Sequence, residues 1–221
     1  MIGTFALTSP FIIMQLRSPL PYMATPRRKV LAALEEISKI KRQRMQGNQT
    51  TEPVKQLRYY DLGSGDGETV LAAASTQEWK ATGIELNSTL WVISMLRRMF
   101  SPRNVRQMSH FIWGDIWKQK VSDADAIMIF GVKPLMPIIA KKIASECRPG
   151  TFVMSYRFHV PLHSAAQMNS SARFGWDDKG ALGAELVYDH EEMRIYELRD
   201  DTVANIKRHA IDSLRSTTSE K

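Results

Sequence analysis

Residues 60–67 read Tyr60-Asp61-Leu62-Gly63-Ser64-Gly65-Asp66-Gly67, with three glycines at alternate positions. An apolar and aromatic run precedes them from Leu57, and the helix-forming run Val70-Leu71-Ala72-Ala73-Ala74 follows at once. Glycine tolerates a positive φ and lets the backbone approach a ligand closely. A helix start adds free N–H groups and the positive end of the helix dipole. The pattern therefore predicts a strand, a tight glycine turn and a helix, with a ligand held at the turn.

A second acidic position follows this turn. The next predicted strand, at about residues 80–85, ends in Glu85, and Asn87 comes shortly after it. An acid at the tip of the second strand is placed to accept hydrogen bonds from ribose hydroxyls. Together with the glycine turn, it indicates a ligand that contains a nucleoside.

The residues around the glycines narrow the choice of ligand. A dinucleotide fingerprint requires a third glycine where this chain has Glu68, and a phosphate-binding loop requires Lys-Ser/Thr where it has Glu68-Thr69. Asp61 and Asp66 add negative charge to the turn. These features favour a ligand with a positive centre and no phosphate. S-adenosylmethionine, which carries an ammonium, a sulfonium and a ribose, fits them.

Hydrophobic periodicity and turn residues predict the remaining elements. A helix with a Val30, Leu34 and Ile37 stripe is expected after Thr25-Pro26. The other expected elements are strands at about 57–62, 80–85, 106–113, 126–130 and 152–158, helices at about 67–77, from Asn87 or Ser88 to Pro102 and from Pro134 to Pro149, a long irregular stretch at 159–183, a hairpin of 184–188 and 193–198, and a helix at 203–214.

Alternating strands and helices predict an α/β fold, a parallel sheet with helices on both faces. The closing hairpin is typical of the seven-stranded, Rossmann-like sheet of class I methyltransferases. Ligands of such sheets bind at the carboxyl ends of the strands. Residues 61–67, Glu85, Asn87 and Asp115 all fall there by this interpretation.

The chain has 221 residues, which allows one domain with extensions. We divide it into an apolar N-terminal segment at 1–22, a basic helix and linker at 23–56, a cofactor-binding domain at 57–200, and a helix and tail at 201–221. The uncharged run before Arg17 is 16 residues long, which is shorter than the roughly 20 residues of a spanning helix. A leader or membrane association through residues 1–22 stays open.

Net charge is +7, and residues 27–58 hold nine Lys/Arg against three Glu, a surplus of +6. This surplus indicates either a solvated helix or an anionic partner, such as a nucleic acid or a membrane surface. The single cysteine, Cys147, excludes an internal disulfide and a cysteine-based zinc site. We expect no metal site.

The motifs taken together resemble the FAM173-type protein-lysine methyltransferases of mitochondria, which act on the ATP synthase c subunit and the adenine nucleotide translocase. The resemblance spans about residues 21–160. It rests on Pro21 to Pro26, Asp61 to Gly67, Gly83-Ile84-Glu85-Leu86-Asn87, Asp115-Ile116-Trp117-Lys118, Phe130-Gly131-Val132 and Arg157-Phe158, in that order.

This resemblance implies roles for individual residues. Asp61, Gly63 and Gly65 would cradle the methionine part of S-adenosylmethionine, Glu85 would hold the ribose hydroxyls, and Asp115 would accept a hydrogen bond from the adenine amino group with Ile116 against the ring. Ser64, Gly67 and Asn87 complete the expected cofactor-binding set. The implied activity is methylation of a lysine on a protein substrate, in the mitochondrion, with the cytoplasm as the alternative location.

The sequence indicates less about the residues that bind the methyl acceptor. Tyr22, Tyr156 and Phe158 could offer aromatic faces to cationic groups, and no general base is assigned. The rival functions are a histone-lysine methyltransferase of the Dot1 type, an RNA methyltransferase that uses Arg27 to Arg44 as a phosphate-binding patch, and a non-enzymatic S-adenosylmethionine-binding protein. Phe130-Gly131-Val132-Lys133 stands where nucleic-acid amino-methylating enzymes carry Asn/Asp-Pro-Pro-Tyr/Phe, which disfavours the second of these.

Overall fold

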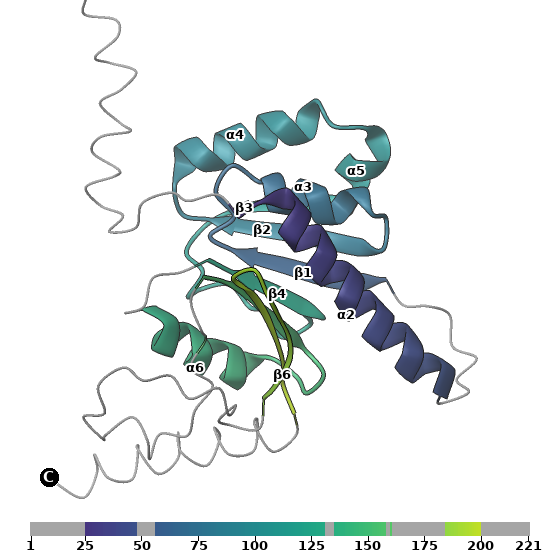
Figure 1. Cartoon of the computed structure of the whole chain (residues 1–221). Helices are drawn as coiled ribbons and strands as arrows, with labels where there is room; N and C mark the ends of the chain where they lie inside the picture. Colours follow the sequence, from purple (N-terminus) through teal and green to yellow (C-terminus); the bar gives the residue numbers. More distant parts are fainter. Residues whose placement is uncertain (1–24, 48–55, 131–134, 158–159, 161–183, 200–221) are drawn as a thin grey trace, which may run out of the picture.

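The structure is a computed structural model that describes residues 25–47, 56–130, 135–157, 160 and 184–199 (Figure 1). The expected N-terminal segment at 1–22, almost all of the irregular stretch at 159–183 and the expected helix at 203–214 lie outside these residues. The boundaries of the predicted domain at 57–200 stay a prediction.

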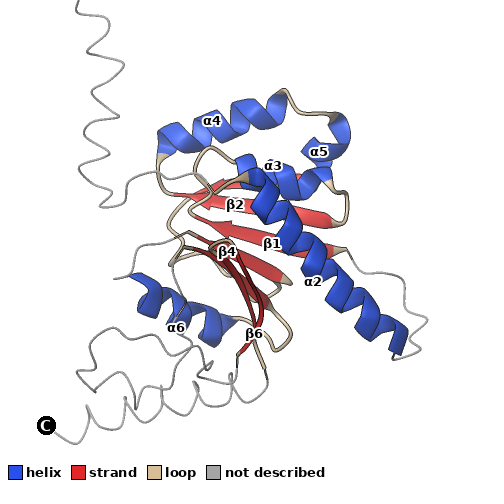
Figure 2. Cartoon of the chain, in the orientation of Figure 1, coloured by secondary structure: helices blue, strands red, loops and turns tan. Residues whose placement is uncertain are grey.

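The described strands form one seven-stranded sheet in the order β3-β2-β1-β4-β5-β7-β6 (Figure 2). Neighbours among the first five strands pair in parallel, and β7 runs antiparallel to both β5 and β6. The strands are β1 (Leu57–Leu62), β2 (Trp79–Glu85), β3 (Ser109–Trp113), β4 (Ala126–Ile129), β5 (Phe152–Tyr156), β6 (Glu185–His190) and β7 (Met193–Glu197). The predicted α/β sheet with its closing hairpin is confirmed.

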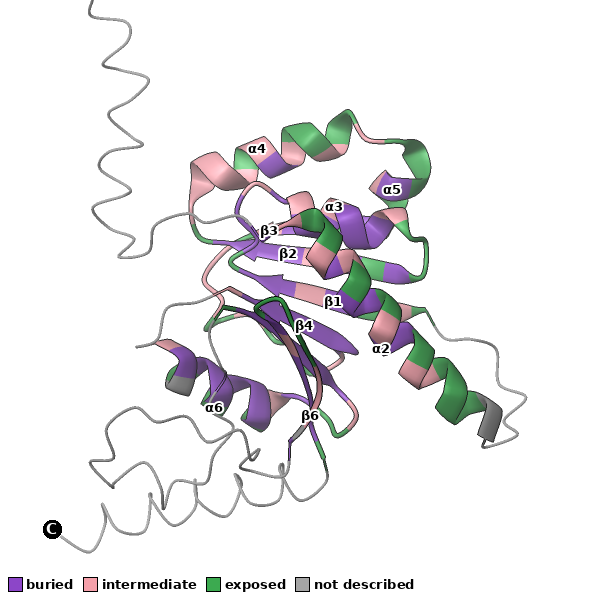
Figure 3. Ribbon diagram, viewed as in Figure 1, coloured by how far each residue is buried: buried purple, intermediate pink, exposed green. Residues whose placement is uncertain are grey.

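Helices cover both faces of the sheet, also as predicted. One face packs against α2 (Arg27–Gly47), α3 (Glu68–Ser75), α4 (Ser88–Met99) and α5 (Arg103–Met108), and the opposite face against α6 (Met136–Glu146). All four residues of β4 are buried, because this central strand has helices on either side (Figure 3). Cys147 packs in the α6 layer, where burial raises the pKa of its thiol to about 12.

The basic helix α2 is held against the sheet by apolar packing and by ion pairs. Its predicted stripe of Val30, Leu34 and Ile37 is fully buried against the core. Its cations reach acids far along the chain: Lys29 pairs with Glu191 at 3.3 Å, Lys41 with Asp125 at 3.1 Å, Arg42 with Glu78 and Arg44 with Glu197. Much of the N-terminal charge surplus therefore serves to hold α2 in place.

One predicted boundary is wrong. Residues 106–108 belong to α5 and not to β3, which begins at Ser109, and α4 ends at Met99 before Pro102. Pro102 caps α5 by accepting from the N–H of Arg106, and the Ser109 hydroxyl donates to the carbonyl of Val105, whose side chain is buried. A six-residue helix with a single buried residue leaves too little periodicity to be detected in the sequence.

Within the described ranges, none of the helices is both long enough and apolar enough to cross a membrane.

Candidate cofactor site

The glycine turn joins β1 to α3 in the conformation that its composition predicts. Gly63, Gly65 and Gly67 all have positive φ, at +86°, +57° and +80°. The N–H groups of Gly63 and Ser64 donate to the carbonyl of Ile84 at 2.9 and 3.1 Å. The turn is therefore attached to the end of β2, and the two predicted ligand-binding elements form one unit.

Gly63 and Gly67 have different roles in the turn. A Cβ placed on Gly63 meets no described atom within 4 Å, so the backbone there faces open space where a ligand can approach. A Cβ on Gly67 would lie 2.6 Å from the Phe111 ring and 2.7 Å from Cβ of Ser94. The structure thus makes Gly67 a packing residue that lets α3 sit against β3 and α4, and its predicted contact with the cofactor stays a prediction.

Glu85 ties the turn together from the tip of β2. One carboxylate oxygen accepts from the N–H of Gly65 at 2.8 Å, and the other accepts from the N–H of Asn87 at 2.8 Å. The side chain is buried. Because each carboxylate oxygen can accept more than one hydrogen bond, these contacts orient the group and leave acceptor capacity for the hydroxyls of a ribose.

Asp61 is a buried acid at the end of β1. Burial, with smaller contributions from Glu85 and Asp66, raises the pKa of its carboxyl to about 7, although a hydrogen bond from the Thr69 hydroxyl favours the ionised form. Burial and the neighbouring negative charges disfavour the ionised form of this carboxyl, and a bound cation would favour it. The turn is therefore prepared for a positively charged ligand.

Ser64 adds an unused polar group to the same turn. Its side chain is buried, and its hydroxyl has no hydrogen-bond partner among the described residues. A buried hydroxyl without a partner is unfavourable, and a ligand group seated in the turn would relieve it. Ser64 belongs with the residues that fit a cofactor.

Asn87 has a structural role that the sequence also predicted. Its side-chain oxygen accepts from the N–H groups of Thr89 and Leu90, so Asn87 is the N-cap of α4. Its side-chain acceptor is therefore engaged in the cap, and the structure offers no separate support for a contact with the cofactor. That role stays a prediction.

Asp115 and Ile116 follow β3 at the same edge of the sheet, and both are half-buried. The N–H of Gly114 donates to the carbonyl of Glu85 at 2.9 Å, which fixes this loop against the end of β2. One carboxylate oxygen of Asp115 accepts from the N–H of Trp117 at 3.0 Å. The other remains for a ligand, so the third predicted binding position lies beside the first two.

Two features of this edge were not predicted. A Cβ on Gly83 would lie 2.6 Å from the Ser64 hydroxyl, so a glycine in β2 is needed for the turn to close. A glycine inside a strand is a recognisable sign of close backbone approach. The second feature is the ring contact of Phe130 with Tyr156, at 5.5 Å between centroids, which lies at the carboxyl ends of β4 and β5. No sequence signal pairs these two rings.

These residues fit S-adenosylmethionine. The turn offers open space over Gly63, a hydroxyl without a described partner at Ser64 and a buried carboxyl at Asp61 whose ionised form a cation would stabilise. Glu85 and Asp115 keep acceptor capacity at the same edge of the sheet. A phosphate-bearing cofactor would place like charge against Asp61 and Glu85.

Comparison with known proteins agrees with this assignment. The family model of the ANTKMT methyltransferase domain matches residues 61–167. The lysine N-methyltransferase of the ATP synthase c subunit from Rattus norvegicus is 32% identical over 162 residues, which cover 73% of this chain and 67% of that protein. The chain belongs to this family of protein-lysine N-methyltransferases. It is therefore an enzyme of a class that takes its methyl group from S-adenosylmethionine.

Other members of the family match over shorter or more divergent regions. The Xenopus laevis lysine N-methyltransferase of the ATP synthase c subunit is 36% identical over 101 residues, 46% of this chain and 43% of that protein. A protein-lysine N-methyltransferase of Saccharolobus islandicus is 26% identical over 141 residues, 63% of this chain and 78% of that protein. This chain thus spans between two fifths and four fifths of these family members.

A solved structure supports the fold. The RNA methyltransferase of Salinibacter ruber, in complex with S-adenosyl-L-homocysteine, superposes with a TM-score of 0.56 over 80% of this chain and 95% of that protein, at 22% identity. At this identity the likeness concerns the fold alone. The class I methyltransferase sheet predicted from the sequence is the architecture that the two share.

Proposed function

We propose that this protein transfers a methyl group from S-adenosylmethionine to a lysine side chain of a mitochondrial membrane protein. The observation that carries the proposal is the convergence of Asp61 and Glu85 on one glycine turn, in a chain whose relatives are named for the lysine methylation of the ATP synthase c subunit and of the adenine nucleotide translocase. The mitochondrial location and the membrane substrate both rest on these relatives.

Each part of the cofactor has a place in this proposal. Asp61, Gly63, Ser64 and Gly65 hold the methionine part, with the Asp61 carboxylate beside its positive charge. Glu85 accepts from the ribose hydroxyls. Asp115 and Ile116 hold the adenine at the end of β3, the acid by its free carboxylate oxygen and Ile116 by apolar contact.

When bound, the cofactor supplies a methyl group on a positively charged sulfur, which an amine can attack in line. The chain's own contribution is to place the two reactants and to exclude water, because correct placement alone accounts for much of the acceleration of such a step. The lysine must be neutral to act as nucleophile, and a buried site favours its neutral form.

The acceptor lysine is proposed to enter beside Phe130 and Tyr156. Tyr156 is buried at the end of β5, and two cations already face its ring, Lys29 at 5.4 Å and Arg157 at 5.6 Å. Aromatic faces attract ammonium groups, whereas the like charge of Lys29 and Arg157 disfavours a third cation here and would favour an incoming lysine in its neutral form. The role expected for Tyr156 stays a prediction, and Tyr22 and Phe158 lie outside the described residues.

The proposal disfavours the nucleic-acid alternative on a specific ground. That function needs Arg27 to Arg44 to be available for phosphates. Lys41, Arg42 and Arg44 instead form ion pairs with acids of the sheet body. A phosphate chain would have to displace these contacts.

The test is incubation of the full chain with tritiated S-adenosylmethionine and separate mitochondrial-membrane, ribosomal and histone fractions. We expect label in a small hydrophobic protein of the mitochondrial membrane, on lysine after hydrolysis. The Glu85→Ala protein is the matched control and should transfer much less label when the cofactor concentration is kept near the dissociation constant of the unchanged protein. Label confined to RNA or to histones would replace the proposed substrate, and cofactor binding without any transfer would leave a binding protein.

A further inference from the structure

The helix α4 is apolar on both of its sides. Trp91 and Met95 pack toward the core, whereas Val92, Leu96 and Met99 point outward with exposed fractions of 46%, 48% and 53%. Phe100, at the end of the helix, is 82% exposed. A surface helix normally turns polar residues toward water, so this outward stripe requires a partner.

Two more exposed apolar side chains lie near the start of α4, at the cofactor edge of the sheet. Leu86 lies just before α4 and Trp113 at the end of β3, with exposed fractions of 59% and 60%, and the Trp113 indole donates to the carbonyl of Leu86 at 3.1 Å. We call Leu86, Val92, Leu96, Met99, Phe100 and Trp113 the α4 face. The exposed turns of α4 are visible in Figure 3.

The segment that carries the α4 face is rich in arginine. Residues 86–113 contain four arginines and no Asp or Glu. Arg98 and Arg106 donate to backbone carbonyls, which hold them without neutralising them, and Arg103 is exposed at the start of α5. Arg97 differs, since it pairs with Asp66 at 2.9 Å.

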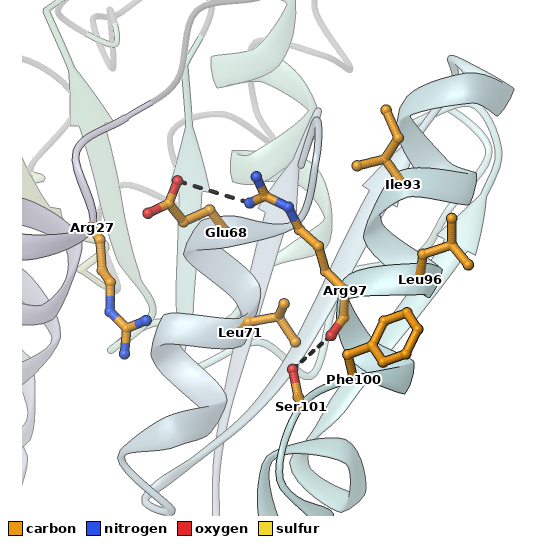
Figure 4. A pocket seen from close by; sticks show the side chains of 8 residues that line it. All are labelled: Arg27, Glu68, Leu71, Ile93, Leu96, Arg97, Phe100 and Ser101. Atoms are coloured by element: carbon orange, nitrogen blue, oxygen red, sulfur yellow. Dashed lines mark hydrogen bonds and ion pairs between the residues drawn. The ribbon is translucent and has the colours of Figure 1, made fainter.

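A groove runs along the inner border of the α4 face. It has a volume of about 530 Å³ and lies between α3 and α4, with Leu71, Ile93 and Leu96 as its apolar lining (Figure 4). Arg27, Arg97 and Glu68 also line the groove, and Glu68 lies 4.0 Å from Arg97, so this border carries charges of both signs.

We propose that the α4 face docks on an anionic phospholipid surface. An interfacial helix places aliphatic and aromatic side chains among the lipids while nearby arginines meet the headgroup phosphates, and exposed tryptophan is suited to the interface itself. The exposed apolar side chains of the α4 face meet the first requirement. The arginines of residues 86–113, a segment without Asp or Glu, meet the second.

Charge argues against the other occupants. A second copy docked face to face would bring arginines against arginines, since an isologous contact pairs the same patch with itself. Residues 1–26 contain no Asp or Glu to meet them. A nucleic acid would find phosphate partners and two exposed rings, Phe100 and Trp113, but the three side chains Val92, Leu96 and Met99 offer no stacking surface.

Docking this way has a consequence for the enzyme, and this part rests on the proposed function. Leu86 and Trp113 lie at the carboxyl edge of the sheet, beside Glu85 and the loop of Asp115. The α4 face would therefore bring the mouth of the cofactor site to the lipid surface, where a lysine of a membrane protein emerges.

The test measures binding of the full chain to vesicles by co-sedimentation, with phosphatidylcholine alone or mixed with phosphatidylglycerol. These vesicles hold no substrate protein, so the outcome is independent of the proposed methylation. We expect binding only to the mixed vesicles, and a loss of roughly tenfold in the Leu96→Gln/Phe100→Gln variant. The control is Ile138→Gln on α6, a side chain also 53% exposed, which should bind as the unchanged protein does.

A second pair of variants tests the charge. Arg103→Gln should weaken binding to the mixed vesicles and reduce its sensitivity to salt, whereas Lys141→Gln, exposed on α6, should do neither. Retained S-adenosylmethionine binding shows that each variant is folded. Equal vesicle binding by the α4 variant and the unchanged protein overturns the proposal, and so does a change in oligomeric state without a change in lipid binding.

Discussion

The carboxylate of Glu85 accepts a hydrogen bond from the backbone N–H of Gly65 at 2.8 Å, across 20 residues of chain. The acid expected to hold the ribose is therefore also a support for the turn expected to hold the methionine part. The two halves of the cofactor site are coupled through one side chain, and a change at Glu85 should be felt at both.

The first prediction concerns Glu85 itself. Glu85→Ala removes the acceptor for the ribose and leaves the N–H groups of Gly65 and Asn87 without their carboxylate. Hydrogen bonds to charged groups contribute about 2 kcal/mol each, so affinity for S-adenosylmethionine should fall by roughly thirtyfold or more. Calorimetric titration measures it. Glu78→Ala, an exposed acid beyond the end of α3, serves as control and should leave affinity unchanged; an unchanged affinity in Glu85→Ala would remove this residue from the site.

The second prediction separates two glycines of the same turn. Gly67→Ala forces a Cβ to 2.6 Å from the Phe111 ring at a positive φ, so it should lower the free energy of unfolding by about 3 kcal/mol. Gly63→Ala meets open space and bears only the backbone strain, about 1 kcal/mol. Its larger effect should be on cofactor affinity, since the new methyl group occupies the approach to the turn. Denaturant unfolding and calorimetry on both variants check the contrast, and the reverse ranking of the two stabilities would contradict it.

The third prediction is a pH dependence at Asp61. The pKa of its carboxyl is about 7 in the folded chain and 3.8 as the ordinary value, so the folded state holds a proton that the unfolded state has lost between these limits. Stability of the cofactor-free protein should therefore fall as pH rises from about 4 to 7 and stay low above that range. One pKa unit corresponds to about 1.4 kcal/mol, which makes the cost on the order of 4 kcal/mol.

Asp61→Asn should remove this slope and raise the stability of the cofactor-free protein at neutral pH. Cofactor binding should show the opposite trend, because a cationic ligand favours the ionised carboxylate: affinity should increase as pH rises through 7 in the unchanged protein and stay flat in Asp61→Asn. Thermal unfolding and calorimetry between pH 5 and pH 8 measure both. Parallel pH profiles for the two proteins would show that Asp61 is not the titrating group.

The elements that a short, local sequence pattern defines could be predicted from the sequence. The run Leu57 to Leu62 is β1 with the bounds expected, and Glu85 stands at the tip of β2 because both strands have apolar patterns that end in turn residues. The helix α5 was not predicted, because Val105 is its single buried residue. The prediction also treated Gly63 and Gly67 alike, since their difference lies in Phe111, more than 40 residues away.

The charges of α2 illustrate the same limit. In the sequence, Arg27 to Arg44 is a basic segment, and several partners could neutralise it. In the structure its cations meet Asp125, Glu78, Glu191 and Glu197, which lie between 36 and 162 residues away along the chain. Composition gives the amount of charge on a segment, whereas only the fold shows where it is used.

The fourth prediction concerns Asp125, one of the acids that pair with the cations of α2. This buried acid accepts from Lys41 at 3.1 Å, from Arg148 at 2.8 Å and from the N–H of Arg58 at 2.9 Å, so it joins α2, the loop after α6 and β1. Asp125→Ala removes the acceptor of two cations, Lys41 with 21% and Arg148 with 48% of its side chain exposed, and of the part-buried N–H of Arg58. It should lower the free energy of unfolding by about 2 kcal/mol. The matched control is Asp123→Ala, two residues away, which loses an ion pair with Arg58, 43% exposed on the acid's side, and a hydrogen bond from the Tyr60 hydroxyl at 2.9 Å. It should cost about 1 kcal/mol. If denaturant unfolding gave the two variants equal losses, the junction at Asp125 would not be what holds α2 to the sheet.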